Sequence, residues 1–317
     1  MRKKILITLI LSATAGLLAL LASFRHTPSD TWTLNANTEE WILFSCSSPL
    51  GDASELYAVK SNGSSLQRLT NMGGRIRSPR WSPDHKWITF SFSNPRSGFV
   101  DDHSERIYKI RSDGSDLTLL TQKGFPPEEH ASWSPNGDMI VFQSHRRDGS
   151  TSIFVMNPDG ENIRQLIDGL DTQYNDPLWS PNGTWIVAKS FHDDGRGELY
   201  LLASENGTVS RLTNNVETQE NILNWHPGGK LLLFASSLNE TTKLFLLSID
   251  NQQIVPLLES LPHSQVFADW SPNGEKIAFL SNHEDGITNI YIMDESTNIS
   301  RISPNLDCTI DSLEWAP

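Results

Sequence analysis

Three short groups of polar side chains are the residues of this sequence best placed to do chemistry. They combine carboxylates, carboxamides and one imidazole, and they stand at or just before segments expected to be innermost strands. The six residues are Glu129, His130, Asn175, Asp176, Glu220 and Asn221. A ring of carboxylate and carbonyl oxygens suits Ca²⁺, which prefers oxygen ligands. The alternative is that these groups cap strand ends in contact with solvent. We predict a binding face without an obligatory cofactor, with Ca²⁺ as the candidate ion.

The signatures of the common catalytic and nucleic-acid-binding classes are absent from the sequence. It has no G-x-S-x-G nucleophile motif, no H-E-x-x-H zinc motif and no glycine-rich phosphate loop. Two cysteines are too few for a cysteine-rich zinc site. The formal net charge of −13 disfavours contact with phosphate backbones. We therefore predict no catalytic residues and no nucleic-acid partner.

A repeated phrase defines the elements that must position the polar groups. WSPNGDMIVF, residues 133–142, has further copies that begin at Trp81, Trp179, Trp225 and Trp270, and a truncated copy at Trp315. Successive tryptophans are separated by 52, 46, 46, 45 and 45 residues. A nearly fixed period in this range indicates stacked supersecondary units. Each tryptophan is expected to pack between neighbouring units rather than to serve as a ligand platform.

Each period contains four short apolar runs separated by turn residues, which predicts four antiparallel strands. In the Ser-Pro-Asn-Gly turns, proline and glycine favour a tight hairpin between the first and second strands. Asp-Gly and Asn-Gly pairs predict the hairpin between the third and fourth strands. Four strands in a period of this length are typical of the blade of a β-propeller.

The two ends of the repeat region are incomplete in complementary ways. Residues 39–70 supply strands two to four of a blade but no Trp-Ser-Pro strand, whereas the segment ending in Trp315-Ala316-Pro317 supplies only that first strand. We therefore predict an all-β fold, a six-bladed β-propeller over residues 39–317, closed by pairing of its N- and C-terminal segments. Such closure removes exposed sheet edges.

The loops at the two ends of the ring differ. Turns between first and second strands are short and uniform, whereas the second-to-third loops vary in length and charge; these are 94–106, 145–151, 191–198 and 282–289. Because function concentrates on loops held by a rigid scaffold, we expect this face to bind. His145, His192 and His283 lie in these loops. They belong to different blades, so exposed turn residues are expected rather than a metal site.

Cys46 and Cys308 both fall in the blade assembled from the two chain ends. Antiparallel pairing would place them at the same end of that blade, so we predict a disulfide, which an exported protein can retain. The alternative is two unpaired thiols. For so long a loop the chain-entropy model gives about 5 kcal/mol as an upper figure.

The N-terminal residues differ from the rest of the chain. Residues 5–24 carry no charge and follow a basic start; that length is enough for a helix to cross a bilayer. The basic residues predict that everything after Phe24 is exported to the periplasmic or extracellular side. Residues 1–24 are either an uncleaved signal anchor or a removed signal peptide. We expect one hydrophobic helix there, membrane contact through residues 5–24, and a polar linker over residues 25–38.

The repeat WSPNGDMIVFQSHRRDGSTSIFVMNPDGENIRQL, residues 133–166, and its sister copies resemble the PD40 (WD40-like) repeats of the TolB family. The resemblance covers residues 39–317 and implies the six-bladed propeller that forms the C-terminal domain of TolB. TolB carries an α/β domain before its propeller. At the corresponding place in this sequence we expect only the polar linker. Because such blades occur in many unrelated proteins, the resemblance is informative about the fold rather than the function.

Two functions from different classes fit these observations. The favoured one is an exported, membrane-tethered binding module whose loop face recognises a protein or a cell-envelope component. The alternative is a propeller enzyme of the lactonase or lyase type with a divalent metal in the central channel. Stoichiometric Ca²⁺ that is lost when Glu129, Asp176 or Glu220 is substituted would favour the enzyme.

Overall fold

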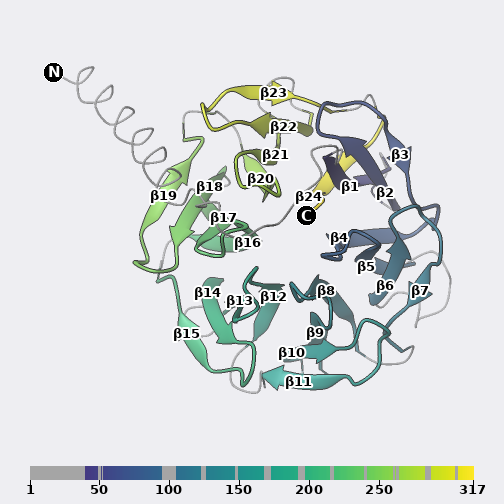
Figure 1. Ribbon diagram of the computed structural model, residues 1–317, viewed down its shortest axis with the longest axis vertical. Helices are drawn as coiled ribbons and strands as arrows, with labels where there is room; N and C mark the ends of the chain where they lie inside the picture. Colours follow the sequence, from purple (N-terminus) through teal and green to yellow (C-terminus); the bar gives the residue numbers. More distant parts are fainter. Residues whose placement is uncertain are drawn as a thin grey trace.

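Figure 1 shows the sheets arranged in a ring about a common axis. The computed structural model describes residues 40–48, 51, 53–94, 105–122, 126–146, 149–167, 173–191, 197–214, 218–238, 241–259, 261, 264–282, 287–303 and 306–317. The described residues form six sheets of four antiparallel strands each. The predicted all-β, six-bladed propeller is confirmed.

We number the blades I to VI in ring order and give the strands of each from the channel outward. Blade I contains β24 (Thr309–Trp315), β1 (Trp41–Ser47), β2 (Ser54–Lys60) and β3 (Gln67–Arg68). Blade II contains β4 (Arg75–Trp81), β5 (Trp87–Ser93), β6 (Arg106–Arg111) and β7 (Thr118–Leu119). Blade III contains β8 (Glu128–Trp133), β9 (Ile140–His145), β10 (Thr151–Met156) and β11 (Arg164–Ile167).

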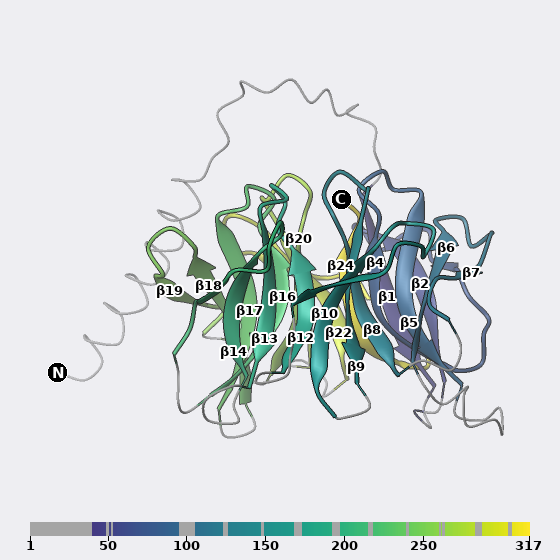
Figure 2. The same cartoon turned by 90° about the horizontal axis from the view of Figure 1, so that it is seen from below.

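The remaining blades follow the same plan. Blade IV contains β12 (Tyr174–Trp179), β13 (Trp185–Ser190), β14 (Glu198–Ala203) and β15 (Val209–Arg211). Blade V contains β16 (Gln219–Trp225), β17 (Leu231–Leu238), β18 (Thr241–Ser248) and β19 (Ile254–Leu257). Blade VI contains β20 (Gln265–Trp270), β21 (Ile277–Ser281), β22 (Asn289–Met293) and β23 (Ile299–Arg301). Figure 2 shows the ring from its edge, with the strands running along the channel axis.

The second and third strands of each blade are apolar on both faces because neighbouring blades cover both faces. In β1, Ile42, Leu43 and Phe44 are all fully buried although alternate residues point to opposite sides. A strand covered on both sides has a continuous apolar run instead of an alternating pattern. The apolar runs seen in the sequence therefore report the stacking of blades around the ring.

Each turn between a first and a second strand places one residue in the left-handed backbone region. Gly137, Gly183, Gly229 and Gly274 fill this position in blades III to VI. In blade II the residue is His85, with φ 59°, at a cost of about 1 kcal/mol for a residue with a side chain. The carboxylate of Asp84 offsets this cost, since it accepts hydrogen bonds from Ser82 Oγ at 2.6 Å and from the N–H of Lys86 at 3.1 Å.

Blade I is assembled from the two ends of the repeat region. β24 pairs antiparallel with β1, so that Ile42 lies opposite Trp315 and Phe44 opposite Leu313. In Figure 1 the yellow β24 lies against the purple β1 at the channel. A disulfide joins Cys46 in β1 to Cys308 just before β24, with their Cα atoms 5.7 Å apart. Strand pairing and a covalent bond thus close the ring at the same place.

The repeated tryptophans pack between blades, as the sequence predicts. Trp81 belongs to a core cluster with Leu43 and Leu56 of blade I, and Trp225 to a cluster with Val187 and Leu199 of blade IV. Five of the six tryptophans are at most 9% exposed, namely Trp81, Trp133, Trp225, Trp270 and Trp315. Each indole therefore joins its blade to the preceding one.

Polar side chains directly before these tryptophans link the innermost strands. Asp269 accepts hydrogen bonds from the backbone N–H groups of Trp270 and Trp315 at 2.6 and 2.7 Å. Glu314 accepts one from the N–H of Trp81 at 2.7 Å and lies 3.9 Å from Arg80. Burial raises the pKa of Asp269 to about 6 and that of Glu314 well above its ordinary value. These carboxyls join adjacent blades by satisfying buried N–H groups.

Several sequence expectations concern residues outside the described part of the chain. The predicted hydrophobic helix within residues 1–24 and the polar linker over residues 25–38 lie there, as do His192, His283 and residues 95–104 of the longest loop. In the ranges that the structure describes, we find no helix with the length and apolar character needed to span a membrane.

Candidate functional site

The channel widens into a cavity of about 930 Å³ at the end of the ring where the innermost strands begin. We call this cavity the channel mouth. The innermost strands of all six blades line it, together with Ser48 and Gly51 after β1 and Thr242 in β18. These last residues flank loops between second and third strands. The cavity therefore opens on the face that carries the irregular loops.

The innermost strands are bent at the channel mouth. In blades II to VI their pairing with the second strand shifts register a few residues before the tryptophan. Ser78, His130 and Asp176 occupy the shifts of blades II, III and IV with φ of 48°, 56° and 54°. Such strain costs on the order of 1 kcal/mol per residue and collects at functional sites. Because a bulge redirects its side chain, all three residues line the cavity.

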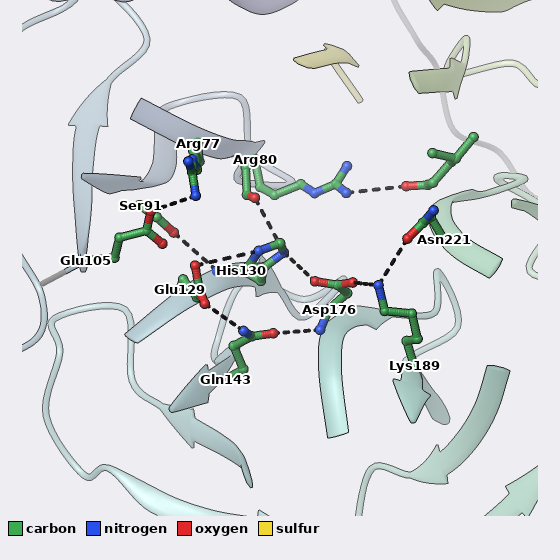
Figure 3. A network of polar contacts seen from close by, with 12 residues as sticks. Arg77, Arg80, Ser91, Glu105, Glu129, His130, Gln143, Asp176, Lys189 and Asn221 are labelled. Carbon is green, nitrogen blue, oxygen red and sulfur yellow. Dashed lines mark hydrogen bonds and ion pairs between the residues drawn. The ribbon is translucent and has the colours of Figure 1, made fainter. Parts of the chain in front are cut away.

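A chain of polar contacts runs through four blades at the mouth (Figure 3). His130 Nδ1 lies 2.8 Å from Asp176 Oδ1 and 3.4 Å from Ser78 Oγ. Lys189 Nζ lies 2.9 Å from Asp176 Oδ2 and donates a hydrogen bond to Asn221 Oδ1 at 3.0 Å. Ser78, His130, Asp176 and Asn221 come from blades II, III, IV and V in turn. The contacts thus fix the innermost strands relative to one another.

A second layer of contacts holds Glu129 behind His130. Glu129 Oε1 lies 2.7 Å from His145 Nε2 and accepts a hydrogen bond from Gln143 Nε2 at 2.9 Å. Gln143 Oε1 in turn accepts one from the backbone N–H of Asp176 at 2.7 Å. Gln143 therefore connects Glu129 with the strained backbone at Asp176. The polar side chains of blades III and IV form one continuous network.

Glu105 and Glu129 are a hydrogen-bonded acidic pair beside Arg77, whose Nη1 lies 3.1 Å from Glu105 Oε1. Burial, with the hydrogen bond to Glu129 and its charge, raises the pKa of Glu105 to about 7. Burial would also raise the pKa of Glu129, but its hydrogen bonds with His145 and Glu105 outweigh burial and lower that pKa to about 2. The pair therefore holds one shared proton between these two pKa values.

The His130–Asp176 pair favours the charged form of both side chains. Burial alone would lower the pKa of His130 and raise that of Asp176. The charge of each residue on the other, and their hydrogen bond, outweigh burial, so the pKa of His130 is raised and that of Asp176 is held well below its ordinary value. The Glu129 hydrogen bond likewise raises the pKa of His145. The charged side chains of this network are therefore paired with one another.

The structure brings four of the six predicted site residues into this network, namely Glu129, His130, Asp176 and Asn221. Asn175 is half-buried in β12, opposite Lys189 of β13. Glu220 is 2% exposed and lies between blades V and IV, near Glu198 and Arg211, where burial raises its pKa to about 7. Counted from the repeated tryptophan, Glu220 stands one residue earlier than Glu129. Since side chains alternate along a strand, it faces away from the mouth.

Sequence reasoning missed several residues of the mouth. Arg77 and Val266 each stand four residues before a repeated tryptophan, as Glu129 does, so an alignment of the copies would have identified them. Phe267 stands next to Val266 in the same strand. Other missed residues belong to the network behind the mouth and carry no such signal: Gln143 and Lys189 in second strands, and Glu105 directly before the third strand β6. His145, expected as an exposed turn residue, is instead half-buried against Glu129.

Ser78, His130 and Asp176 have the residue types of a catalytic triad but not its geometry. Ser78 and Asp176 both approach the same imidazole nitrogen, Nδ1. In a triad the acid holds one nitrogen and the nucleophile uses the other. The second nitrogen of His130, Nε2, faces Glu129 Oε2 at 3.8 Å. This arrangement does not activate Ser78 as a nucleophile.

The acidic residues at the mouth do not converge on a metal position. No group of three or more His, Cys, Asp or Glu side chains within the described ranges could hold a metal ion. The carboxylate of Glu129 is taken up by His145 and Gln143, and that of Asp176 by His130 and Lys189. The residues fit a hydrogen-bonded rim rather than a Ca²⁺ site.

Glu105→Gln is expected to flatten the pH dependence of stability. The pKa of Glu105 is raised from 4.5 to about 7, so the folded state holds a proton that the unfolded state releases. The stability from this group is present below pH 4.5 and is lost as the pH rises through about 7. Glutamine cannot ionise and still offers an N–H to Glu129. Thermal unfolding at about pH 5 and about pH 8 should therefore differ less in the variant than in the wild type.

Glu161→Gln is the matched control, since it makes the same substitution in an exposed turn between β10 and β11. It is expected to keep the pH dependence of the wild type. An equal change of melting temperature with pH in wild type and Glu105→Gln would contradict a proton shared by Glu105 and Glu129.

The fold and the mouth together define the class of protein, a closed six-bladed β-propeller built on Trp-Ser-Pro repeats with a polar opening to its channel. The family model of the TolB beta propeller domain, PD40, matches residues 38–221. This is more than half of the chain. The chain therefore belongs to the TolB β-propeller (PD40) family.

Individual relatives agree with this placement. The chain is 32% identical over 125 residues to "Uncharacterized protein Atu1656" of Agrobacterium fabrum, a match covering 36% of this chain and 39% of that protein. It is 34% identical over 64 residues to the Tol-Pal system protein TolB of Nitratidesulfovibrio vulgaris, covering 19% and 14%. The chain thus spans well under half of these curated relatives. The crystal structure of TolB from Acinetobacter baumannii is similar in fold, with a TM-score of 0.72 and 20% identity over 88% of this chain and 67% of that one.

Proposed function

We propose that this chain is an exported binding module that holds a segment of a protein partner of the cell envelope in its channel mouth. The observation that carries the proposal is the open cavity of about 930 Å³ to which all six innermost strands contribute. Apolar side chains remain open to solvent there, since Val266 and Phe267 are 37% and 39% exposed. Concave sites with an apolar wall and a few fixed polar groups are typical of ligand binding.

The polar network at the mouth supports binding by a preformed surface. Its side chains are paired with one another across blades II to V, so that little rearrangement is needed when a partner arrives. Preorganised sites lose less conformational entropy on association. The triad-like set at His130 lacks an activated nucleophile, which favours binding over a lactonase- or lyase-type reaction.

Export and membrane tethering are part of the proposal. They are supported by the uncharged segment 5–24 after a basic start and by the disulfide, a bond that persists in oxidising compartments. In this arrangement residues 1–24 act as an anchor and residues 25–38 as a linker to the propeller. The proposal does not include a role in the Tol-Pal system, because the match to TolB of Nitratidesulfovibrio vulgaris covers 19% of this chain.

Site-specific photo-crosslinking in native membranes tests the proposed function. A photoreactive phenylalanine analogue at Phe267, in the full chain, is expected to form a discrete adduct with a protein partner. The same analogue at Ile254, which is 44% exposed on the outermost strand of blade V, is the control and should not form it. Identical adducts from both positions, or none from Phe267 under conditions that crosslink Ile254, would contradict binding at the mouth.

A further inference from the structure

The channel mouth has two chemically different walls. Blade II contributes Arg75 and Arg77, whereas blades V and VI contribute Ile222, Val266 and Phe267. Figure 1 shows β4 of blade II across the channel from β16 and β20 of blades V and VI. A ligand that fills the cavity therefore meets cations on one side and apolar surface on the other.

The arginine wall keeps a positive charge although the chain as a whole has a formal net charge of −13. Within the described ranges Arg75 has no ionic partner and is exposed. Arg77 pairs with Glu105 at 3.1 Å, but the raised pKa of Glu105, about 7 because of burial and of Glu129, leaves that carboxyl partly neutral at neutral pH. Arg77 is therefore only partly compensated.

The other charged groups at the mouth cancel this excess only in part. Asp176 lies between His130 and Lys189, and both make ion pairs with it. Asp311 accepts a hydrogen bond from Ser47 and lies in the field of Arg77, so it offsets part of the charge of Arg77 and leaves that of Arg75. The local field thus favours an anion at the blade II side. An unpaired arginine fork suits a carboxylate, which it can bind through two parallel hydrogen bonds.

We propose that the mouth selects polypeptide segments in which an acidic residue stands close to a large apolar residue, the carboxylate on Arg75 and Arg77 and the apolar side chain on Val266 and Phe267. This inference rests on the proposed function and names the chemistry of its partner. It requires both walls, because the arginines supply selectivity by charge and the apolar wall supplies surface to bury.

Synthetic peptides test the selection directly. The probes are Gly-Ser peptides with a phenylalanine flanked by glutamates, the same peptide with lysines in place of glutamates, and the glutamate peptide with alanine in place of phenylalanine. Fluorescence anisotropy with the full chain should show tightest binding of the first peptide, with an affinity that falls as salt is added. Arg75→Gln with Arg77→Gln should weaken this binding by about tenfold or more, as expected for a lost charge-assisted hydrogen bond.

Phe267→Ala should weaken binding of the glutamate–phenylalanine peptide and leave the affinity for its alanine counterpart unchanged. Arg164→Gln and Ile254→Ala, on outermost strands, remove the same kinds of side chain away from the mouth and should leave every affinity unchanged within about twofold. Equal binding of the glutamate and lysine peptides, or binding indifferent to the two arginines, would overturn the inference while leaving the proposed function intact. Absence of binding by all three peptides, together with absence of the Phe267 crosslink, would overturn both.

Discussion

A chain that ends at Cys308, and so lacks β24, is expected to lose its cooperative unfolding transition. β24 supplies the innermost strand of blade I, and Ile310, Leu313 and Trp315 are each at most 6% exposed. Their burial contributes about 4 to 9 kcal/mol in total, a large part of the roughly 5 to 15 kcal/mol that stabilises a typical domain. The truncation also removes the main-chain partners of β1 and the Trp315 N–H that Asp269 binds.

Circular dichroism and tryptophan fluorescence on heating measure this effect. A chain that ends at Ala316 is the control, because it lacks only the exposed Pro317 and should melt like the full chain. The truncated chain retains both cysteines, so its loss of stability reports strand pairing rather than the disulfide. A single sharp transition near the temperature of the full chain would show that the ring does not depend on β24.

Replacing both cysteines by serine is expected to lower the melting temperature by up to roughly 10 °C, because the cross-link contributes at most about 5 kcal/mol. The disulfide joins residues 262 positions apart, and a cross-link over so long a loop strongly restricts the unfolded chain. β24 stays paired with β1 in this variant, so it should still fold cooperatively.

Reductant provides the control for this second experiment. It should lower the melting temperature of the wild type to that of the Cys46→Ser, Cys308→Ser variant and leave the variant unchanged. Intact-mass measurement of the oxidised and reduced wild type shows whether the bond is present in the isolated protein. Equal melting of oxidised wild type and variant would mean that strand pairing alone holds the closure.

The fold could be predicted in detail because the same sequence motif recurs in every blade. The spacing of Trp133, Trp179 and Trp225 defines the length of a blade. The turn residues between them mark the strands, and the missing first strand before Trp41 indicates that the last segment must complete blade I. The turn and strand signals are local, whereas the period and the complementary ends follow from comparing the repeated copies.

The candidate site could be predicted only in part, because its contacts join residues of different blades. His130 and Asp176 were identified from their types and positions, but their ion pair depends on a register shift in each strand that the sequence does not display. Glu220 was placed beside Asn221 at the mouth, although strand alternation turns it into the space between blades IV and V. Position relative to the repeated tryptophan is therefore a better guide than chemical type.

The placement of β24 has a consequence for the order of events during synthesis. β1 emerges from the ribosome near the beginning of the chain, but its inner neighbour, Thr309–Trp315, emerges more than two hundred and fifty residues later. Until then β1 presents an unsatisfied row of backbone donors and acceptors toward the axis. Contacts over such separations form slowly. The nascent chain must therefore keep this strand shielded until β24 has been made, and holdase assistance should be needed most just before that point.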